Sequence, residues 1–225
     1  MNFLKIILNH IYFLNFKTLY FNFKYLPFNQ AIKFPILISR YTYLKNCTGN
    51  IKINSKKIKT GMIRIGKNGV GIFDEKKSRS IWEVSGQVIF SGKCIIGHGS
   101  KISVGDTACL EFGDNFVITA ESSIVCQKKI TFGNDCLLSW EILIMDTDFH
   151  KIKSLDGNIL NPSSEIFIGN HVWIGCKSLI LKGSVISDNN IIGANSLVSS
   201  KLLQSNSVYA GNPVRIVKQD ISWEL

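Results

Sequence analysis

The chain has 225 residues, of which 45% are hydrophobic and 19% charged, a balance that is typical of a globular protein and excludes a disordered one. This length suffices for one domain with a small extension, and two full domains would be cramped. The six cysteines have neither C-x-x-C spacing nor the density of a disulfide scaffold, so we expect reduced thiols and no zinc site.

The net charge of +10 belongs to the N-terminal third of the chain. Residues 1–73 hold 12 of the 26 Lys and Arg residues and no acidic residue, because the first one is Asp74. Such a basic block suits nucleic acid, an anionic membrane surface or solvent alone. The chain carries no motif that reads nucleic acid, so we expect no nucleic-acid partner.

Residues 1–45 form a basic and aromatic extension. Their apolar residues have near-helical spacing, but Lys5 and Lys17 are among the polar residues that break every run short of the roughly 18–20 residues of a spanning helix. No small-residue cleavage site follows. We therefore expect this segment to stay on a cytoplasmic protein, either packed on its body or lying against the inner face of the membrane.

A six-residue repeat dominates residues 88–205, after a lead-in over residues 46–87 and before a C-terminal segment, 206–225. Every sixth residue is aliphatic and β-branched at Ile168, Ile174, Ile180, Ile186, Ile192 and Val198. Small residues recur four positions after three of these, at Ser178, Ser184 and Ser196. This period fits short strands joined by tight turns, whose coils stack as parallel strands around an aliphatic column. The repeat predicts an all-β solenoid.

The same period recurs upstream in blocks that are offset by two residues. The blocks are Phe90, Ile96 and Ile102; Val104 and Leu110; Phe112, Ile118, Ile124 and Ile130; and Phe132, Leu138 and Ile144. We interpret each offset as an insertion at a turn.

The repeat stops between Ile144 and Ile168. In register, it would place His150, Asp156 and Pro162 inside the coil, where a dry aliphatic column does not accept them. Residues 146–164 must therefore leave the coil as a protruding loop. A loop of this length in a compact repeat is more often functional than decorative.

The repeat, together with "IGANSLVSS" and "VYAGNPVRIV" near the C-terminus, resembles the hexapeptide-repeat acyltransferases. The similarity is greatest to the branch of maltose, galactoside, capsule and O-antigen O-acetyltransferases. The resemblance implies a left-handed parallel β-helix and a homotrimer with active sites between neighbouring subunits. It also implies acetyl-coenzyme A as donor and, as acceptor, a sugar hydroxyl of a surface polysaccharide or its precursor.

By this resemblance, His150 is the catalytic base, and its ordinary pKa near neutrality suits that task. The alternative is a histidine that only fixes the loop. Asp146 and Asp148 either orient the imidazole, as the acid of a triad does, or cap the loop backbone. Trp173 either borders the active site or packs between subunits.

The resemblance also implies where the donor binds. Small residues along the last coils, Cys176, Ala194, Ser199 and Ser200, allow the pantetheine arm to approach. Arg215 and Lys218 match basic positions that meet the phosphates, or else are surface charges. Family members often have Thr-Lys in place of Ser199 and Ser200, so Lys201 is the candidate substitute.

The remaining histidines do not indicate a metal. His98 and His171 lie in turn-like sequences, where we expect them to be solvated, and the four histidines include no H-x-x-x-x-H pair. We therefore expect no metal. Two rival functions stay open: an N-acetyltransferase of an amino sugar nucleotide, and a non-catalytic β-helical scaffold.

Overall fold

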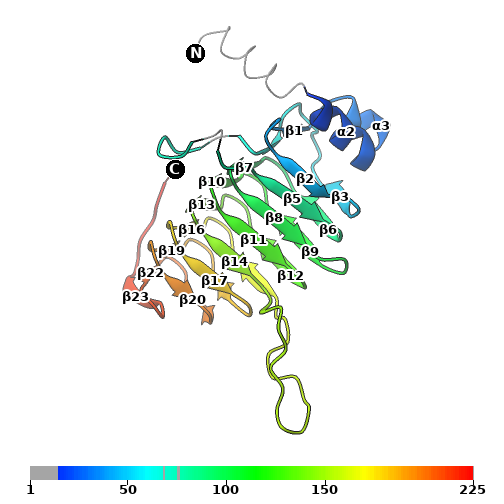
Figure 1. Cartoon of the computed structure of the whole chain (residues 1–225). Helices are drawn as coiled ribbons and strands as arrows, with labels where there is room; N and C mark the ends of the chain where they lie inside the picture. Colours follow the sequence, from blue (N-terminus) through cyan, green and yellow to red (C-terminus); the bar gives the residue numbers. More distant parts are fainter. Residues whose placement is uncertain (1–14, 68, 75–76, 225) are drawn as a thin grey trace.

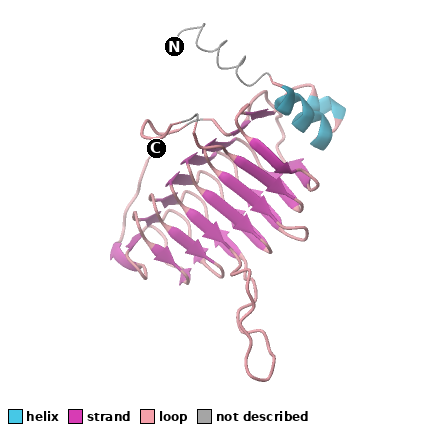
Figure 2. Ribbon diagram, viewed as in Figure 1, coloured by secondary structure: helices cyan, strands magenta, loops and turns pink. Residues whose placement is uncertain are grey.

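The computed structural model describes residues 15–67, 69–74 and 77–224. In this part of the chain the strands wind into a prism whose sides are three sheets, with the helices at one end (Figures 1 and 2). Each coil adds one strand to each sheet, so strands that are three apart in the sequence are neighbours. The predicted left-handed parallel β-helix is confirmed.

We call the sheets A, B and C in the order in which the chain visits them. Sheet A contains β1 (Ile36–Ile38), β4 (Ile63–Ile65), β7 (Cys94–His98), β10 (Phe116–Ala120), β13 (Leu137–Trp140), β16 (Trp173–Ile174), β19 (Ile191–Ile192), β22 (Val208–Ala210) and β23 (Arg215–Lys218). Sheet B contains β2 (Tyr43–Asn46), β5 (Ile81–Val84), β8 (Lys101–Val104), β11 (Ser123–Cys126), β14 (Leu143–Met145), β17 (Leu179–Leu181) and β20 (Leu197–Val198). Sheet C contains β3 (Asn50–Ile53), β6 (Gln87–Phe90), β9 (Cys109–Phe112), β12 (Lys129–Phe132), β15 (Ile166–Ile168), β18 (Val185–Ile186) and β21 (Lys201–Leu202). Among these described strands, β23 is antiparallel to β22, and the other pairs are parallel.

The core is the column of inward residues that the repeat predicts. The six aliphatic positions from Ile168 to Val198 have no exposed surface. The serines that lie four positions after an inward residue, Ser178, Ser184 and Ser196, are also buried. The Ser178 hydroxyl donates to the Gly193 carbonyl at 3.0 Å, and the Ser184 hydroxyl donates to the Val198 carbonyl at 3.1 Å. These bonds satisfy polar groups that would otherwise be costly inside the column.

Coil length explains the two-residue offsets. Ile96 pairs with Ile118, Ile118 with Leu138, and Ile174 with Ile192, so these coils are 22, 20 and 18 residues long. At Leu110/Phe112 and Ile130/Phe132 the extra residues lengthen strands: β9 and β12 each have four residues with two of them inward, whereas β18 in the same sheet has two residues. The turns after β12 and β18 are equally long, so the interpretation as turn insertions is wrong for these two offsets, where the added pair continues the strand with one more inward residue.

The β-helix starts earlier than residue 88. Ile36 pairs with Ile63, and Ile63 pairs with Cys94, at separations of 27 and 31 residues. The expected lead-in over residues 46–87 therefore belongs to the coils, as does the end of the expected extension. Long connections between these first strands remove the six-residue period, and this is why the sequence pattern placed the start too late.

Two helices, α2 (Phe16–Tyr25) and α3 (Phe28–Ala31), cover the first coil. The ring of Phe21 is buried and meets the Trp82 ring edge-on at 5.4 Å. The Asn22 side chain accepts from the backbone N–H of Ile36 at 3.1 Å and donates to its carbonyl at 2.7 Å. This side chain pairs both backbone polar groups of Ile36 at the open edge of sheet A. None of the helices in the described part of the chain is long and apolar enough to cross a membrane.

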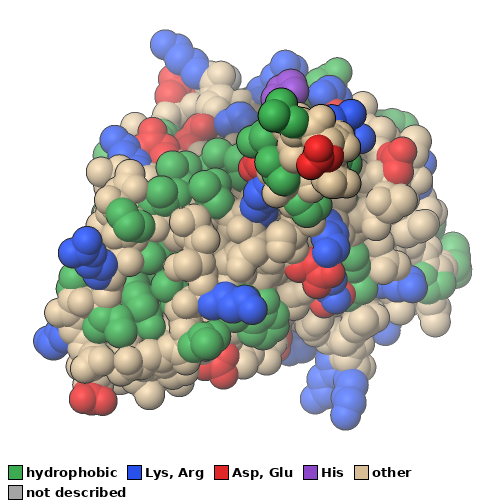
Figure 3. All heavy atoms as spheres, turned by 90° about the horizontal axis from the view of Figure 1, so that it is seen from below, with side chains coloured by type: hydrophobic (Ala, Val, Ile, Leu, Met, Phe, Trp, Pro, Cys, Tyr) green, Lys and Arg blue, Asp and Glu red, His purple; other side chains and the backbone are tan. Residues whose placement is uncertain are grey.

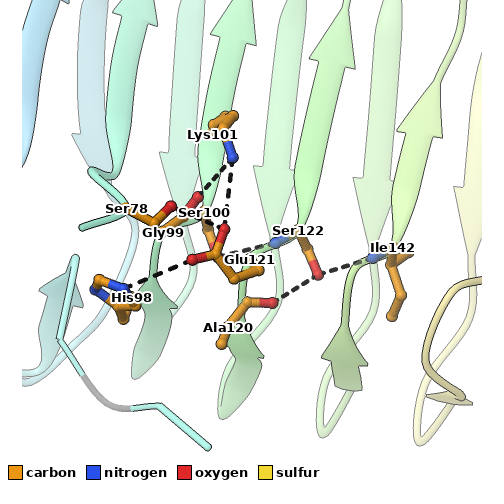
Figure 4. A network of polar contacts seen from close by, with 9 residues as sticks. All are labelled: Ser78, His98, Gly99, Ser100, Lys101, Ala120, Glu121, Ser122 and Ile142. Atoms are coloured by element: carbon orange, nitrogen blue, oxygen red, sulfur yellow. Dashed lines mark hydrogen bonds and ion pairs between the residues drawn. The ribbon is translucent and has the colours of Figure 1, made fainter. Parts of the chain in front are cut away.

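Two histidines expected to be solvated are packed. Only 3% of His98 is exposed, and its Nε2 lies 3.6 Å from Oε1 of Glu121, whose Oε2 accepts from the Ser78 hydroxyl at 3.0 Å (Figure 4). Ser78 lies between β4 and β5 in the sequence. The ring of His171 stacks on that of Trp223 with centroids 4.1 Å apart. The expectation of solvated side chains was wrong, because each ring lies against a residue distant in sequence.

Candidate active site

Residues 146–164 leave the coil between β14 and β15, as predicted, and project far from the body (Figure 1). The loop closes on itself through an antiparallel bridge between Lys153 and Ile159. Its two ends meet where the Ser164 N–H donates to the Asp146 carbonyl at 3.0 Å. Since β14 is in sheet B and β15 in sheet C, the loop leaves the prism at the edge opposite sheet A.

Asp146 anchors the start of the loop. Its side chain is fully buried, and its two carboxylate oxygens accept from the backbone N–H groups of Gln127, at 2.7 Å, and Lys128, at 2.8 Å. The Cys126 thiol lies 3.6 Å from the same carboxylate, and burial followed by this negative charge raises the pKa of that thiol. The carboxylate therefore caps the turn between β11 and β12, which is the loop-capping alternative.

Asp148 belongs to a cluster that we call the loop clamp, formed by Asp148, Asn161 and Lys182. The Lys182 ammonium lies 2.5 Å from Asp148 Oδ2 and donates to the Asn161 carbonyl at 3.0 Å. The Asn161 amide donates to the same Asp148 oxygen at 2.8 Å. The hydrogen bonds from Lys182 and then Asn161 lower the pKa of Asp148. The clamp fastens both strands of the loop base to the next coil.

The clamp also fixes the backbone of His150. The His150 N–H donates to the Asp148 carbonyl at 2.6 Å, and the His150 carbonyl accepts from the Asn161 amide at 2.9 Å. The preceding residue, Phe149, has a φ of 60°, an uncommon conformation for a bulky side chain. Within the described ranges the exposed imidazole has no hydrogen bond or ion pair, so neither aspartate orients it inside one protomer. The ring is free to meet a substrate or a second subunit.

Trp173 lies on the outward side of sheet A. It is 36% exposed, its indole N–H donates to the Ser139 hydroxyl at 3.2 Å, and its ring lies 6.1 Å from that of Trp223. Because sheet A is opposite the edge that carries the loop, one protomer does not bring Trp173 and His150 together.

The expected donor-binding residues lie on two edges of the prism and on sheet A. Cys176 and Ala194 follow strands of sheet A on adjacent coils, where the Asn195 N–H donates to the Cys176 carbonyl at 2.8 Å. Ser199 and Ser200 are exposed at the edge between sheets B and C, directly before Lys201 in β21.

The two expected phosphate contacts lie on the last strand. Arg215 and Lys218 are exposed on β23, paired with Ala210 and Val208. The structure therefore places the expected donor residues on either side of sheet B and at the C-terminal end of the prism.

Lys182 and Asn161 are site residues that the sequence interpretation missed. The register carried the signal for Lys182: Met145 pairs with Leu181, so the residue after each strand, Asp146 or Lys182, occupies the same edge on adjacent coils. A lysine at this position lies next to the loop base. Among the described residues, no cluster of His, Cys, Asp and Glu has the geometry to hold a metal ion.

Known proteins match both the sequence and the fold. No protein-family model matches the chain. A polysialic acid O-acetyltransferase of Neisseria meningitidis is 49% identical over 104 residues, which are 46% of this chain and 48% of that protein. The match thus spans about half the length of that relative. An uncharacterized 24.8 kDa protein in the cps region of Klebsiella pneumoniae is 28% identical over 201 residues, 86% of this chain and 88% of that protein.

A solved structure shares the architecture. The polysialic-acid-specific acetyltransferase NeuO aligns with a TM-score of 0.56 and 18% identity, over 82% of this chain and 89% of that one. The likeness to NeuO concerns the fold, whereas the proteins of Neisseria meningitidis and Klebsiella pneumoniae are similar to this chain in sequence. The resemblance found in the repeat is therefore confirmed: the chain is similar in sequence to a polysialic acid O-acetyltransferase over about half of its length, and it shares the fold of NeuO.

Proposed function

We propose that this protein is an O-acetyltransferase that moves an acetyl group from acetyl-coenzyme A to a sugar hydroxyl of a capsule or O-antigen type polysaccharide, or of its precursor. The observation that carries the proposal is the loop clamp, which fixes the backbone of His150 and leaves its imidazole free. Relatives named as polysialic acid O-acetyltransferases, and one from a cps region, support the class of acceptor.

In the proposed reaction His150 acts as general base. The sugar oxygen forms a bond to the acetyl carbonyl carbon while the neutral imidazole takes the hydroxyl proton. The carbon–sulfur bond then breaks, and the coenzyme leaves as a thiol after it receives that proton. Asp148 and Asn161 serve this step as positioning residues through the His150 backbone, and Asp146 holds the loop to the preceding coil.

The proposed active site lies between subunits of a homotrimer. His150 and Trp173 lie on opposite parts of one prism, so only a neighbouring subunit could bring a loop to the face of sheet A. The loop also exposes apolar side chains, with Ile152 at 58%, Leu155 at 108% and Leu160 at 61%. Seen from the side toward which the loop projects (Figure 3), hydrophobic patches alternate with single Lys and Arg side chains. Such surface is typical of an interface.

The donor is proposed to pass along the small side chains of Cys176 and Ala194 and beside Ser199 and Ser200. Arg215 and Lys218, with Lys201, would bind its phosphates through charge-assisted contacts. The double variant Arg215→Ala/Lys218→Ala should weaken acetyl-coenzyme A binding by about tenfold or more, with an unchanged affinity for the acceptor. Calorimetric titration measures the affinity for acetyl-coenzyme A. Unaltered affinity in the double variant would show that both residues are only surface charges.

We further propose that this cytoplasmic enzyme contacts the inner membrane face through its N-terminal helices. The outward side of α2 and α3 exposes Phe16 at 78%, Phe23 at 44% and Phe28 at 72%, next to Lys24 and Lys33. Aromatic residues interleaved with cations suit an anionic bilayer surface. In a sedimentation assay with anionic vesicles, the vesicle-bound fraction of Phe16→Ser/Phe28→Ser should be much smaller than that of the wild type. Equal bound fractions would contradict the membrane contact.

The function itself is tested by incubating the pure protein with acetyl-coenzyme A and three acceptors: de-O-acetylated capsular polysaccharide, a neutral polysaccharide and an amino sugar nucleotide. The proposal expects acetyl groups on polysaccharide hydroxyls, detected by mass and removed by mild alkali. An alkali-stable acetyl amide on the nucleotide would identify the rival N-acetyltransferase. If the protein neither transfers acetyl groups nor binds the donor, the rival scaffold function is indicated.

A further inference from the structure

A cationic hollow lies at the N-terminal end of the prism, outside the candidate active site. Its volume is about 730 Å³, which is in the range of small-molecule sites. We call it the basic cleft. It lies where the connection between β3 and β4 passes the turns before β7 and β10, and its charged lining residues are Lys57, Lys59, Arg64, Lys93 and Asp114.

The charges of the basic cleft are unbalanced. Four cations, Lys57, Lys59, Arg64 and Lys93, face one carboxylate, that of Asp114. That carboxylate is engaged, because its Oδ1 accepts from the backbone N–H groups of Lys93 at 2.7 Å and Asn115 at 2.8 Å. The cleft therefore keeps an excess of positive charge.

Two of the cations are free and two are held. Within the described ranges, the exposed ammonium groups of Lys57 and Lys59 have no ion pair or hydrogen bond. The Arg64 Nε donates to the Gly61 carbonyl at 3.1 Å, and the Lys93 ammonium donates to the Asn115 side chain at 3.3 Å. A bound anion would thus meet two positioned cations and two that have nothing else to neutralise them.

The floor of the basic cleft suits a sugar rather than a bare ion. Arg64 in β4 pairs with Ile95 in β7 on sheet A, and Met62 directly precedes β4. Ile95 and Met62 offer apolar surface to the C–H face of a sugar ring, and the hydroxyl groups of Ser55 and Thr60 offer hydrogen bonds. Cations, hydroxyl groups and apolar surface together match a saccharide that carries carboxylates.

The location separates the basic cleft from acetyl transfer. The cleft begins on β4 and β7 of sheet A, and Trp173 lies three strands beyond β7 on the same sheet. At the usual spacing of parallel strands this is about 15 Å along the prism. The loop with His150 leaves from the opposite edge. A monosaccharide cannot occupy both places, whereas a polymer of a few sugar units can extend from one toward the other.

We propose that the basic cleft binds acidic sugar residues of a polymeric acceptor, at a distance from the hydroxyl that is acetylated. This inference rests on the proposed function, and it adds a second binding site, which holds several acidic units of the acceptor away from the acetylated hydroxyl. The cleft gives longer chains a lower KM, because binding of remote units adds affinity without touching the reacting atoms.

The test compares two double variants with the same change in charge. Lys57→Gln/Lys59→Gln removes the free cations of the cleft, and Lys52→Gln/Lys56→Gln removes two exposed lysines of the same region that do not line it. Binding of fluorescently labelled polysialic acid is measured by anisotropy at low and high salt, with neutral dextran and inorganic phosphate as competitors. Circular dichroism confirms that both variants fold.

The proposal expects polysialic acid binding that salt weakens and that falls about tenfold in the cleft variant, but less than about twofold in the control. Dextran should not compete, and phosphate should compete only weakly. Equal loss in both variants would show general charge steering and overturn the inference. Phosphate competing as well as the polymer would overturn it in favour of a simple anion site.

A kinetic arm separates this inference from the proposed function. On a long acidic acceptor the cleft variant should show a raised KM with an unchanged kcat. On a single sugar unit, the KM and kcat of the cleft variant should both match those of the wild type. Acetylation with an unchanged KM for the polymer would refute the cleft and leave the function standing. Conversely, polymer binding through the cleft without any acetyl transfer would refute the function and keep the cleft.

Discussion

The Lys182 ammonium lies 2.5 Å from the Asp148 carboxylate, and through this contact the coil after the loop holds the base of the loop. The side chains are 22% and 45% exposed. An ion pair with this exposure adds little to the free energy of unfolding, because solvent screens it. Its effect is therefore local: it fixes the course of residues 146–164 and hence of the His150 backbone.

Lys182→Met should loosen the loop without destabilising the β-helix. We expect protease cleavage within residues 151–160 to become about tenfold faster, and kcat for acetyl transfer to fall, with a melting temperature close to that of the wild type. Lys177→Met is the matched control, since its ammonium lies 3.8 Å from Glu141 on a different edge. A loop equally resistant in both variants would contradict the role of the clamp.

The clamp should open in acid. Hydrogen bonds from Lys182 and Asn161 hold the pKa of Asp148 below its usual value of 3.8, so the clamp's stabilisation is complete above that value and is lost as the pH falls through the lower folded pKa. Pepsin cleavage of the loop, scaled to an unstructured peptide, should therefore rise below about pH 4. Asp148→Asn should be cleaved rapidly at every pH; retention of the acid-dependent step in this variant would assign the step to another group.

Asp146 should behave as a structural residue. Asp146→Ala leaves the backbone N–H groups of Gln127 and Lys128 without their acceptor, which costs about 1–3 kcal/mol of the free energy of unfolding. Asp146→Asn should cost less, because it keeps one acceptor oxygen. Denaturant unfolding measures both, with Asp156→Ala at the exposed loop tip as the unaffected control. A stable Asp146→Asn that loses nearly all turnover would instead support direct orientation of the imidazole.

Assembly provides an independent test of the shared active site. Because His150 and Trp173 lie on opposite parts of one protomer, the protein should be a homotrimer in solution. Size exclusion with light scattering should give three times the 25.2 kDa chain mass at micromolar concentration. A monomer under these conditions, combined with full activity, would place the whole site within one chain.

The inward column and the protruding loop could be predicted from the sequence because both follow from one rule, that aliphatic residues recur every six positions. Ile168 and its successors obey the rule, whereas His150 and Pro162 break it. The first coils could not be predicted in the same way. Between Ile36 and Cys94 the connections are long, so the strands pair without leaving a fixed period.

The roles of individual polar residues depended on contacts distant in sequence. Asp146 has the same local sequence whether it orients a histidine or caps a turn, and only the position of Gln127 and Lys128 decides between them. His98 is buried beside the carboxylate of Glu121, a residue of a later coil. The position of Lys182, by contrast, could have been predicted from the sequence, since the register of β14 and β17 places it beside the loop.

The central claim is that His150 is the base of acetyl transfer, and its most direct test is the turnover of His150→Ala with acetyl-coenzyme A and an O-acetyl acceptor polysaccharide. We predict that kcat falls by about 10²- to 10⁴-fold while circular dichroism and assembly stay unchanged, because a positioned base contributes about that much. Turnover equal to that of the wild type would contradict the claim.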